Sequence, residues 1–190
     1  SDEGSVSQWV DTLGRLKIGE PTMLPAVIAE DTELKLDKSP YLVKDALVVL
    51  PGAKLTIHPG TVIWFRSLGL IVKGQIQILG TEKNPVRLAG LGSSYWKGLF
   101  FDRSNTENKL NYCKIVNAEF GIRASHSTVS IQNCLFQDNV WGIVVDNGTA
   151  EIHSSLIRTC EKSGIAARKA RLKVKQSIIT ENNSGGFLLD

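Results

Sequence analysis

The segment Gly142-Ile143-Val144-Val145 is one copy of a pattern, glycine–apolar–any residue–apolar, that returns along the chain at near-constant spacing. Further copies begin at Ala46 (with alanine in place of glycine), Gly69, Gly98, Gly121, Gly164 and Gly186. The last four copies start 21, 22 and 22 residues apart. A fixed period of this length is typical of a solenoid whose turns stack on one another.

Other positions follow the same period. Three further registers are Leu110, Ile131, Ile152 and Val174; Cys113, Cys134, Ser155 and Ser177; and Ile115, Phe136, Ile157 and Ile179. Within each period, apolar residues alternate over short runs, and Gly, Asn or Asp separates the runs. Alternation with period two predicts strands rather than helices. Several short strands in each turn predict an all-β fold, a parallel β-helix solenoid.

The first half carries another version of this coil, in which Leu55 and Ile57 are matched by Ile76 and Ile78. The stretch from Val49 to Phe65 contains the turn dipeptides Pro51-Gly52 and Pro59-Gly60. This stretch and its continuations at 69–74, 80–86 and 96–99 resemble the right-handed parallel β-helix repeat proteins of bacterial secreted or cell-surface proteins, in the pectin-lyase-like superfamily. The resemblance covers roughly residues 40–190. It implies a right-handed helix, for which we predict about seven coils, and an extracytoplasmic location in the periplasm or at the cell surface.

Two segments depart from the repeat. Residues 1–30 lack it, and we expect them to be a cap, a strand along the side or a linker, ahead of a β-helix domain over 31–190. They include the apolar residues Trp9, Val10, Leu13, Leu16 and Ile18. The interval from Ile78 to Leu110 is 32 residues instead of 21. This interval predicts an insertion over residues 91–108 that loops out on one side, and whether it carries any activity stays open.

The rest of the sequence offers few residues that could bind nucleic acid or a metal, form a disulfide or direct export. The net charge of +3 comes without a recognised nucleic-acid module, so no nucleic-acid partner is predicted. Cys113 and Cys134 share an inward register, where we expect small buried residues rather than a disulfide. The three histidines have no Cys or His at ligand spacing, so no metal or cofactor is predicted. The sequence shows no signal peptide and no membrane span, so export would depend on residues ahead of Ser1.

Acidic residues argue against a polysaccharide lyase or hydrolase, because they do not recur in one outward register. Those that could lie on neighbouring coils are Asp102, Glu119, Asp138, Asp146, Glu151, Glu161 and Glu181. We therefore predict no catalytic residue. Asp138 falls in a corner register with Thr159, and Asn139 and Asn182 fall one place further on, where we expect hydrogen bonds at the corner.

Outward positions are the best functional clue. The third residue of the repeated pattern should point away from the core, and its register reads Val48, Ile71, Phe100, Arg123, Val144, Ala166 and Leu188. A second outward register reads Lys114, Leu135, Leu156 and Ile178. Apolar stripes of this length predict a partner interface, a surface covered by the N-terminal segment, or only the preference of such residues for strands.

We therefore predict a non-catalytic interaction or scaffold module of an exported bacterial protein, with a protein partner or self-association through Val48, Ile71, Phe100, Val144, Ala166 and Leu188. The first alternative is a carbohydrate-binding module for a polysaccharide, with Phe120 and Trp141, 21 residues apart, as a stacking platform. The second alternative is a fragment of a polysaccharide lyase or hydrolase.

Overall fold

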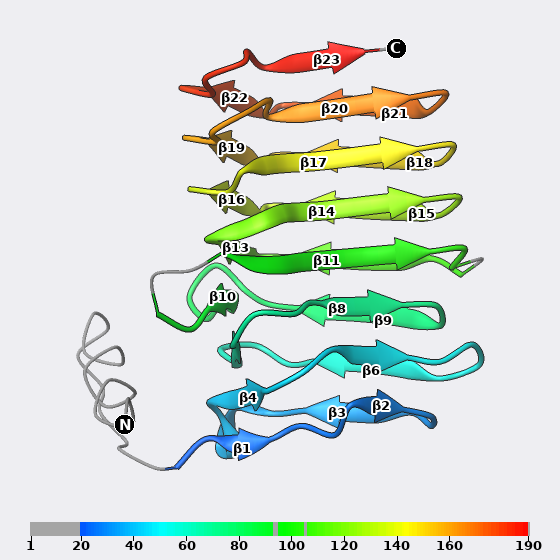
Figure 1. Cartoon of the computed structure of the whole chain (residues 1–190), viewed down its shortest axis with the longest axis vertical. Coiled ribbons are helices and arrows are strands. Elements are labelled where there is room, and N and C mark those ends of the chain that lie inside the picture. The colour runs from blue at the N-terminus through cyan, green and yellow to red at the C-terminus, as the bar shows by residue number, and fades with distance from the viewer. Residues whose placement is uncertain (1–19, 93–94, 105, 190) are drawn as a thin grey trace.

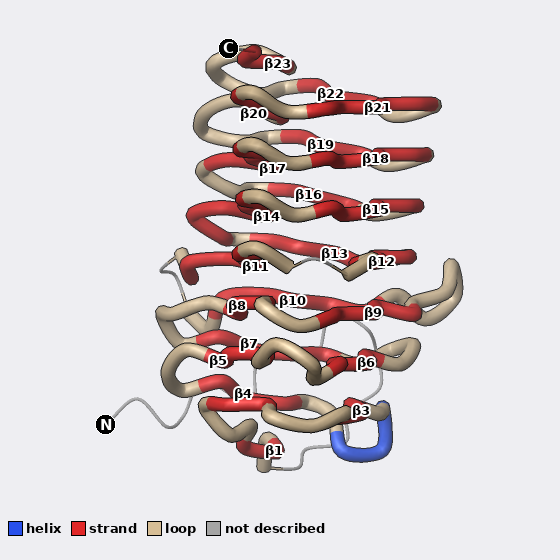
Figure 2. Tube along the Cα trace, turned by 90° about the vertical axis from the view of Figure 1, so that its right-hand side faces the viewer, coloured by secondary structure: helices blue, strands red, loops and turns tan. Residues whose placement is uncertain are grey.

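The computed structural model describes residues 20–92, 95–104 and 106–189. The chain forms a stack of coils whose strands lie above one another in three columns (Figures 1 and 2). All strand pairs are parallel, and each column is a sheet. The described residues contain one short 3-10 helix, η3 (Leu36–Lys38), and no α-helix. The predicted all-β parallel solenoid is confirmed.

Each of the first seven coils contributes one strand to each sheet, and within the described residues the eighth contributes strands to sheets A and B only. Sheet A contains β1 (Thr22–Met23), β4 (Tyr41–Val43), β7 (Val62–Phe65), β10 (Val86–Gly90), β13 (Cys113–Val116), β16 (Leu135–Gln137), β19 (Leu156–Arg158) and β22 (Ile178–Thr180). Sheet B contains β2 (Val27–Ile28), β5 (Leu47–Val49), β8 (Leu70–Val72), β11 (Trp96–Asp102), β14 (Ala118–Ser125), β17 (Trp141–Asp146), β20 (Ile165–Arg168) and β23 (Phe187–Leu189). Sheet C contains β3 (Thr32–Leu34), β6 (Lys54–Ile57), β9 (Gln75–Leu79), β12 (Asn108–Asn111), β15 (Thr128–Gln132), β18 (Thr149–His153) and β21 (Arg171–Lys175).

The solenoid has about eight coils, one more than the sequence predicts. The first coil consists of β1, β2 and β3, and it begins inside the segment that we expected to be a cap, a side strand or a linker. β1 pairs with β4, and β2 pairs with β5. Two-residue strands are too short to show an alternating pattern, which is why the sequence does not reveal them. Residues 1–19 of that segment lie outside the described residues.

The predicted registers are confirmed where the sequence repeats most clearly. Ile143 pairs with Ile122 on one side and with Ile165 on the other, and all three side chains are fully buried. The registers that begin at Leu110 and Ile115 also stack as predicted. Like residues therefore lie above like residues in one continuous core along the axis of the stack.

Glycine begins the repeated pattern because neighbouring coils approach closely there. A Cβ atom on Gly142 would lie 2.2 Å from the backbone carbonyl oxygen of Gly164, one coil further on. No side chain fits at that distance without a shift of the backbone. The regular spacing of these glycines along the chain thus follows from the stacking of the coils, and Gly98 alone among them also has a positive φ, of 108°.

The corners of the later coils use left-handed backbone conformations at residues other than glycine. One ladder of such residues lies at each of the three corners, with φ between 46° and 56°: Arg103, His126, Asn147 and Lys169 between sheets B and C; Tyr112, Asn133, Ser154 and Gln176 between sheets C and A; and Asn117, Asp138, Thr159 and Glu181 between sheets A and B. This conformation costs a residue with a Cβ about 1 kcal/mol or more. Stacking of the flanking strands offsets that cost in each coil.

The segment 91–108 differs from the predicted single insertion. Strand β11 lies inside it and pairs with β8 and β14, so most of it belongs to the stack. The extra length of this coil is spread over connections 80–85, 91–95 and 103–107, which are longer than the corresponding connections 133–134, 138–140 and 147–148. One extended coil therefore carries three longer corners instead of one loop.

Candidate functional site

The outer face of sheet B carries the predicted apolar stripe. Its residues pair in one continuous register, one from each strand: Val27, Val48, Ile71, Phe100, Arg123, Val144, Ala166 and Leu188. The register is as predicted, and the structure adds Val27 from the first coil. We call these eight residues the sheet B stripe. Among its apolar residues the two at the ends are exposed, Val27 by 47% and Leu188 by 52%, whereas Ala166 is buried.

Arg123, the charged residue of the sheet B stripe, takes part in an aromatic cluster. Its guanidinium carbon lies 5.4 Å from the centroid of the Phe120 ring, within the range of a cation–π interaction. The Phe100 ring meets the Phe120 ring edge-on, with the centroids 5.9 Å apart and the planes at 64°. The single positive charge in the stripe is thus held over an aromatic ring.

The two residues of the predicted glycan platform lie on adjacent strands. Phe120 pairs with Trp141 in the register of β14 and β17, and both side chains are half-buried. Each ring has a cation close by, because the Lys162 ammonium lies 5.0 Å from the Trp141 centroid and Arg123 lies over Phe120. A sugar that stacked on these rings would compete with the two cations for the ring faces.

Polar pairs flank the sheet B stripe on both sides along the strands. On the C-terminal side, Asp146 accepts a hydrogen bond from Arg168 at 2.8 Å, and this contact lowers the pKa of the Asp146 carboxyl. On the N-terminal side, the Tyr95 hydroxyl donates to Glu161 at 2.7 Å, which raises the pKa of Tyr95 to about 12. Lys97 pairs with Glu119 on the same side.

Three further acidic side chains of the predicted set, Asp102, Glu151 and Asp138, also have local partners. Asp102 lies 3.7 Å from Lys73, and Glu151 lies 3.5 Å from Lys173. Asp138 accepts a hydrogen bond from the Thr159 hydroxyl at 2.6 Å, which confirms the predicted polar ladder at that corner. Within the described ranges, no group of three His, Cys, Asp or Glu side chains is placed to hold a metal ion.

The cysteines are buried free thiols. Burial raises the pKa of Cys113 well above its ordinary value, that of Cys134 to about 12 and that of Cys160 to about 11. The thiolate is the reactive form of cysteine, and at neutral pH these three side chains stay protonated. They act as small core residues, as the shared register predicts for Cys113 and Cys134.

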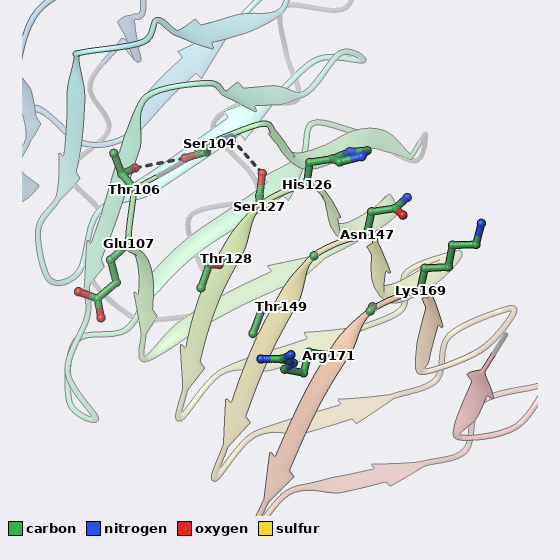
Figure 3. A pocket seen from close by; sticks show the side chains of 12 residues that line it. Ser104, Thr106, Glu107, His126, Ser127, Thr128, Asn147, Thr149, Lys169 and Arg171 are labelled. Atoms are coloured by element: carbon green, nitrogen blue, oxygen red, sulfur yellow. Dashed lines mark hydrogen bonds between the residues drawn. The ribbon is translucent and has the colours of Figure 1, made fainter.

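A groove at the corner between sheets B and C is a feature that our sequence analysis did not identify. Its volume is about 780 Å³ (Figure 3). One ridge consists of the corner residues His126, Asn147 and Lys169, and the other consists of Thr128, Thr149 and Arg171 at the starts of three strands of sheet C. Small residues, Ser127, Gly148 and Ala170, lie between the ridges. A small residue between two larger ones at each 21- to 22-residue step is the sequence signal that could have revealed it.

One end of the groove is built by the long connection 103–107. The backbone N–H of Ser104 donates to the Ser127 hydroxyl at 3.0 Å, and the Ser104 hydroxyl contacts that of Thr106 at 3.2 Å (Figure 3). Glu107 lies at this end, whereas Lys169 and Arg171 lie three coils away (Figure 3). The groove is therefore lined mainly by polar side chains and changes from acidic to basic along the stack.

Comparison with known proteins shows a similarity over part of the chain. The chain is 33% identical over 124 residues to "Protein bark beetle" of Drosophila melanogaster. The matched region is 63% of this chain but only 4% of that protein, so the chain corresponds to a small part of its relative. No protein-family model and no solved structure matches the chain. Membership of the pectin-lyase-like superfamily and a bacterial source both stay predictions. Among the described residues, no helix has the length and apolar character needed to span a membrane.

Proposed function

We propose that this chain is a non-catalytic protein-interaction module of an exported protein, and that it binds through the outer face of sheet B. The observation that carries the proposal is the sheet B stripe, in which seven of eight consecutive residues are apolar. A solvent-facing position on a strand needs no apolar side chain for folding, and a run of them along a whole sheet favours an interface.

The surroundings of the stripe support this proposal. The apolar stripe lies between two rows of polar pairs, Asp146–Arg168 on one side and Tyr95–Glu161 with Lys97–Glu119 on the other. An apolar centre with a polar rim is the usual composition of a protein–protein interface. Each of the three acids in these pairs has a basic or hydroxyl partner. A binding partner would therefore contact mainly the apolar surface of this face rather than a free carboxylate.

A second copy of the chain is the partner that we propose, because a two-fold symmetric dimer is the commonest closed assembly. The test replaces Val144 and Leu188 with lysine. The parent should have about twice the chain mass of 20.8 kDa in light scattering, and the Val144→Lys, Leu188→Lys variant should have the monomer mass with a similar melting temperature. A matched control places the same two charges on sheet C, as Gln77→Lys and Ser130→Lys, and should stay dimeric. A parent that is monomeric at every concentration overturns the self-association.

A specific observation favours a carbohydrate ligand as the second candidate function. The groove between sheets B and C is lined by hydroxyl, amide, imidazole and cationic side chains, which suit the hydroxyl groups of an extended sugar chain. A glycan array tests this candidate. If the groove binds the sugar, Asn147→Ala should weaken any hit while Trp141→Ala should not; if the aromatic pair binds it, the two results should be reversed. An array without hits removes both forms of this candidate.

A further inference from the structure

Two asparagines of the chain stand in the tripeptide Asn–x–Ser/Thr, with x other than proline, which is the acceptor sequence for N-linked glycosylation in secreted proteins. They are Asn147, which begins the segment Asn-Gly-Thr at 147–149, and Asn182, which begins Asn-Asn-Ser at 182–184. A glycan is bulky and hydrophilic, so its acceptor has to lie at the surface with a free side-chain amide nitrogen. The structure separates the two asparagines on this criterion.

Asn147 meets the requirement. It lies at the short corner 147–148 between β17 and β18, it is exposed, and its backbone has a left-handed φ of 50°. Its backbone N–H donates to the Arg168 carbonyl at 3.0 Å, and within the described residues its side-chain amide makes no hydrogen bond. Figure 3 shows that the side chain stands between His126 and Lys169 and points away from the strands of sheet C. The nitrogen that would carry a sugar is therefore free.

The fold of this corner does not require the acceptor sequence. The equivalent corner positions one coil earlier and one coil later hold His126 and Lys169, in the same left-handed conformation. Thr149 pairs with Thr128 on one side and with Arg171 on the other. Because different residues serve the same positions in neighbouring coils, stacking alone does not account for an asparagine followed two places later by a threonine.

Asn182 fails the requirement. Its side-chain oxygen accepts a hydrogen bond from the Cys160 N–H at 3.0 Å, and its Nδ2 donates to the Ile157 carbonyl at 3.3 Å. A Cβ atom on Gly164 would lie 2.8 Å from that nitrogen, so the neighbouring coil leaves no space for a sugar on it. A chain that carried a glycan at Asn182 could not close this corner of the stack.

We propose that Asn147 carries an N-linked glycan and that Asn182 does not. In the attachment step, Nδ2 of Asn147 forms a bond to C1 of the first sugar of an oligosaccharide held on a lipid pyrophosphate. The bond between C1 and the pyrophosphate oxygen breaks, the lipid pyrophosphate leaves, and the amide nitrogen gives up one proton. Thr149 completes the acceptor sequence.

The position of Asn147 limits how a partner can approach. Asn147 lies three residues beyond Val144 of the sheet B stripe, past the polar pair Asp146–Arg168. The glycan stands at the edge of sheet B beside the groove and keeps this corner in solvent. A partner of the sheet B stripe therefore has to leave this side of the sheet uncovered.

This inference rests on the proposed function in one respect, because attachment of the glycan requires an exported chain. It also requires a eukaryotic secretory pathway. The similarity to a protein of Drosophila melanogaster favours such a source over the predicted bacterial one.

The test directs the full chain into the secretory pathway of mammalian cells with a cleavable signal peptide. The secreted parent should exceed the chain mass of 20.8 kDa by the mass of one glycan. Peptide N-glycosidase F should remove this excess. Mass spectrometry of the glycopeptides should place the glycan on Asn147. A parent without a glycan, or with a glycan on Asn182, overturns the proposal.

Four variants supply the controls. Asn147→Gln and Thr149→Ala each destroy the acceptor sequence and should carry no glycan, whereas Thr149→Ser preserves it and should carry one. Ser184→Ala destroys only the second acceptor sequence, leaves the Asn182 side chain in place, and should also carry one glycan. Protein retained in the cells is analysed in the same way, so poor folding of a variant does not hide the result. A glycan that remains in Asn147→Gln, or one that is lost in Ser184→Ala, overturns the proposal.

Failure of the proposed interface is distinguishable from failure of this inference. If the parent carries a glycan on Asn147 but is monomeric in light scattering, self-association through sheet B is wrong and the glycan site stands. If the parent is dimeric and carries no glycan, the interface stands and the glycan site is wrong.

Discussion

The side-chain oxygen of Asn139 accepts a hydrogen bond from the backbone N–H of Ala118, one coil earlier, at 2.9 Å. The Asn139 amide group also donates to the Ile115 carbonyl at 3.1 Å. Asn182, two coils after Asn139, makes the same two contacts. Its side-chain oxygen accepts a hydrogen bond from the Cys160 N–H at 3.0 Å, and its amide group donates to the Ile157 carbonyl at 3.3 Å. This confirms the predicted hydrogen bonding at the corner between sheets A and B. One side chain thus satisfies two backbone groups that the turn leaves unpaired.

Replacing Asn139 with alanine should cost stability, because it leaves two buried backbone groups without partners. At about 1–3 kcal/mol for each unsatisfied group, we expect the free energy of unfolding to fall by about 3 kcal/mol. Asn182→Ala removes the same two bonds at a half-buried site, where water can replace them, and should cost less. Urea unfolding measures both losses. Equal losses of unfolding free energy in the two variants would show that the contribution of the asparagine does not depend on how deeply it is buried.

The core register predicts the effect of a charge at Ile143. Ile143→Asp places an unpaired carboxylate between Ile122 and Ile165 in the fully buried interior, at a cost of several kcal/mol, and should abolish cooperative unfolding. Ile143→Val removes one methyl group and should cost about 1 kcal/mol. Thermal melts followed by circular dichroism compare the two. A cooperative melt at the parent's temperature in the aspartate variant is incompatible with the register.

The buried thiols predict slow chemical modification. Because burial raises the pKa of Cys134 to about 12 and that of Cys160 to about 11, little thiolate forms in the native protein at pH 8. Ellman's reagent should therefore react rapidly with none of the three cysteines in the native protein. After denaturation it should react with all three. The denatured sample serves as the control. Rapid reaction of one thiol in the native protein would place that cysteine at the surface.

The left-handed corners predict a stabilising substitution. Gln176 is exposed and has a φ of 50°, so Gln176→Gly relieves the conformational cost of its Cβ. After the entropy that glycine loses on folding, we expect a gain of about 0.5–1 kcal/mol. Gln132 is also exposed but lies in β15, and Gln132→Gly should lower stability by a similar amount. Denaturant midpoints distinguish the two signs. A loss at both positions would mean that the Gln176 side chain contributes more than its backbone costs.

The contact between Asp146 and Arg168 predicts a dependence of stability on pH. Arg168 lowers the pKa of Asp146 in the folded state below its ordinary value of 3.8. The resulting stabilisation is present above the unfolded pKa and is lost as the pH falls through the folded pKa. Asp146→Asn should therefore be less stable than the parent at pH 7, and the difference should vanish in strong acid. This difference in stability should be small, since the pair lies at the surface. A difference that stays constant at all pH values would exclude the Asp146 charge as its source.

The sequence alone was sufficient for the central register and for the parallel β-solenoid. Ile122, Ile143 and Ile165 recur at a fixed period within alternating runs, and both signals are local in the chain. The sheet B stripe follows from the same information, because a strand that turns one residue inward must turn the next one outward. The function of the stripe does not follow from it, since the register does not say what covers an outward face.

The tertiary structure decided the features that depend on contacts between coils. Tyr112 and Gln176 are not turn-forming residues, and only the stacked strands on either side hold them in a left-handed conformation. The groove beside Asn147 exists because corner and strand side chains project on either side of small residues. Trp64 on sheet A is buried, whereas Phe100 on sheet B is half-buried, although both occupy outward positions. An outward side chain becomes buried only when another part of the molecule lies across it, and that is a property of the folded chain, not of its repeat.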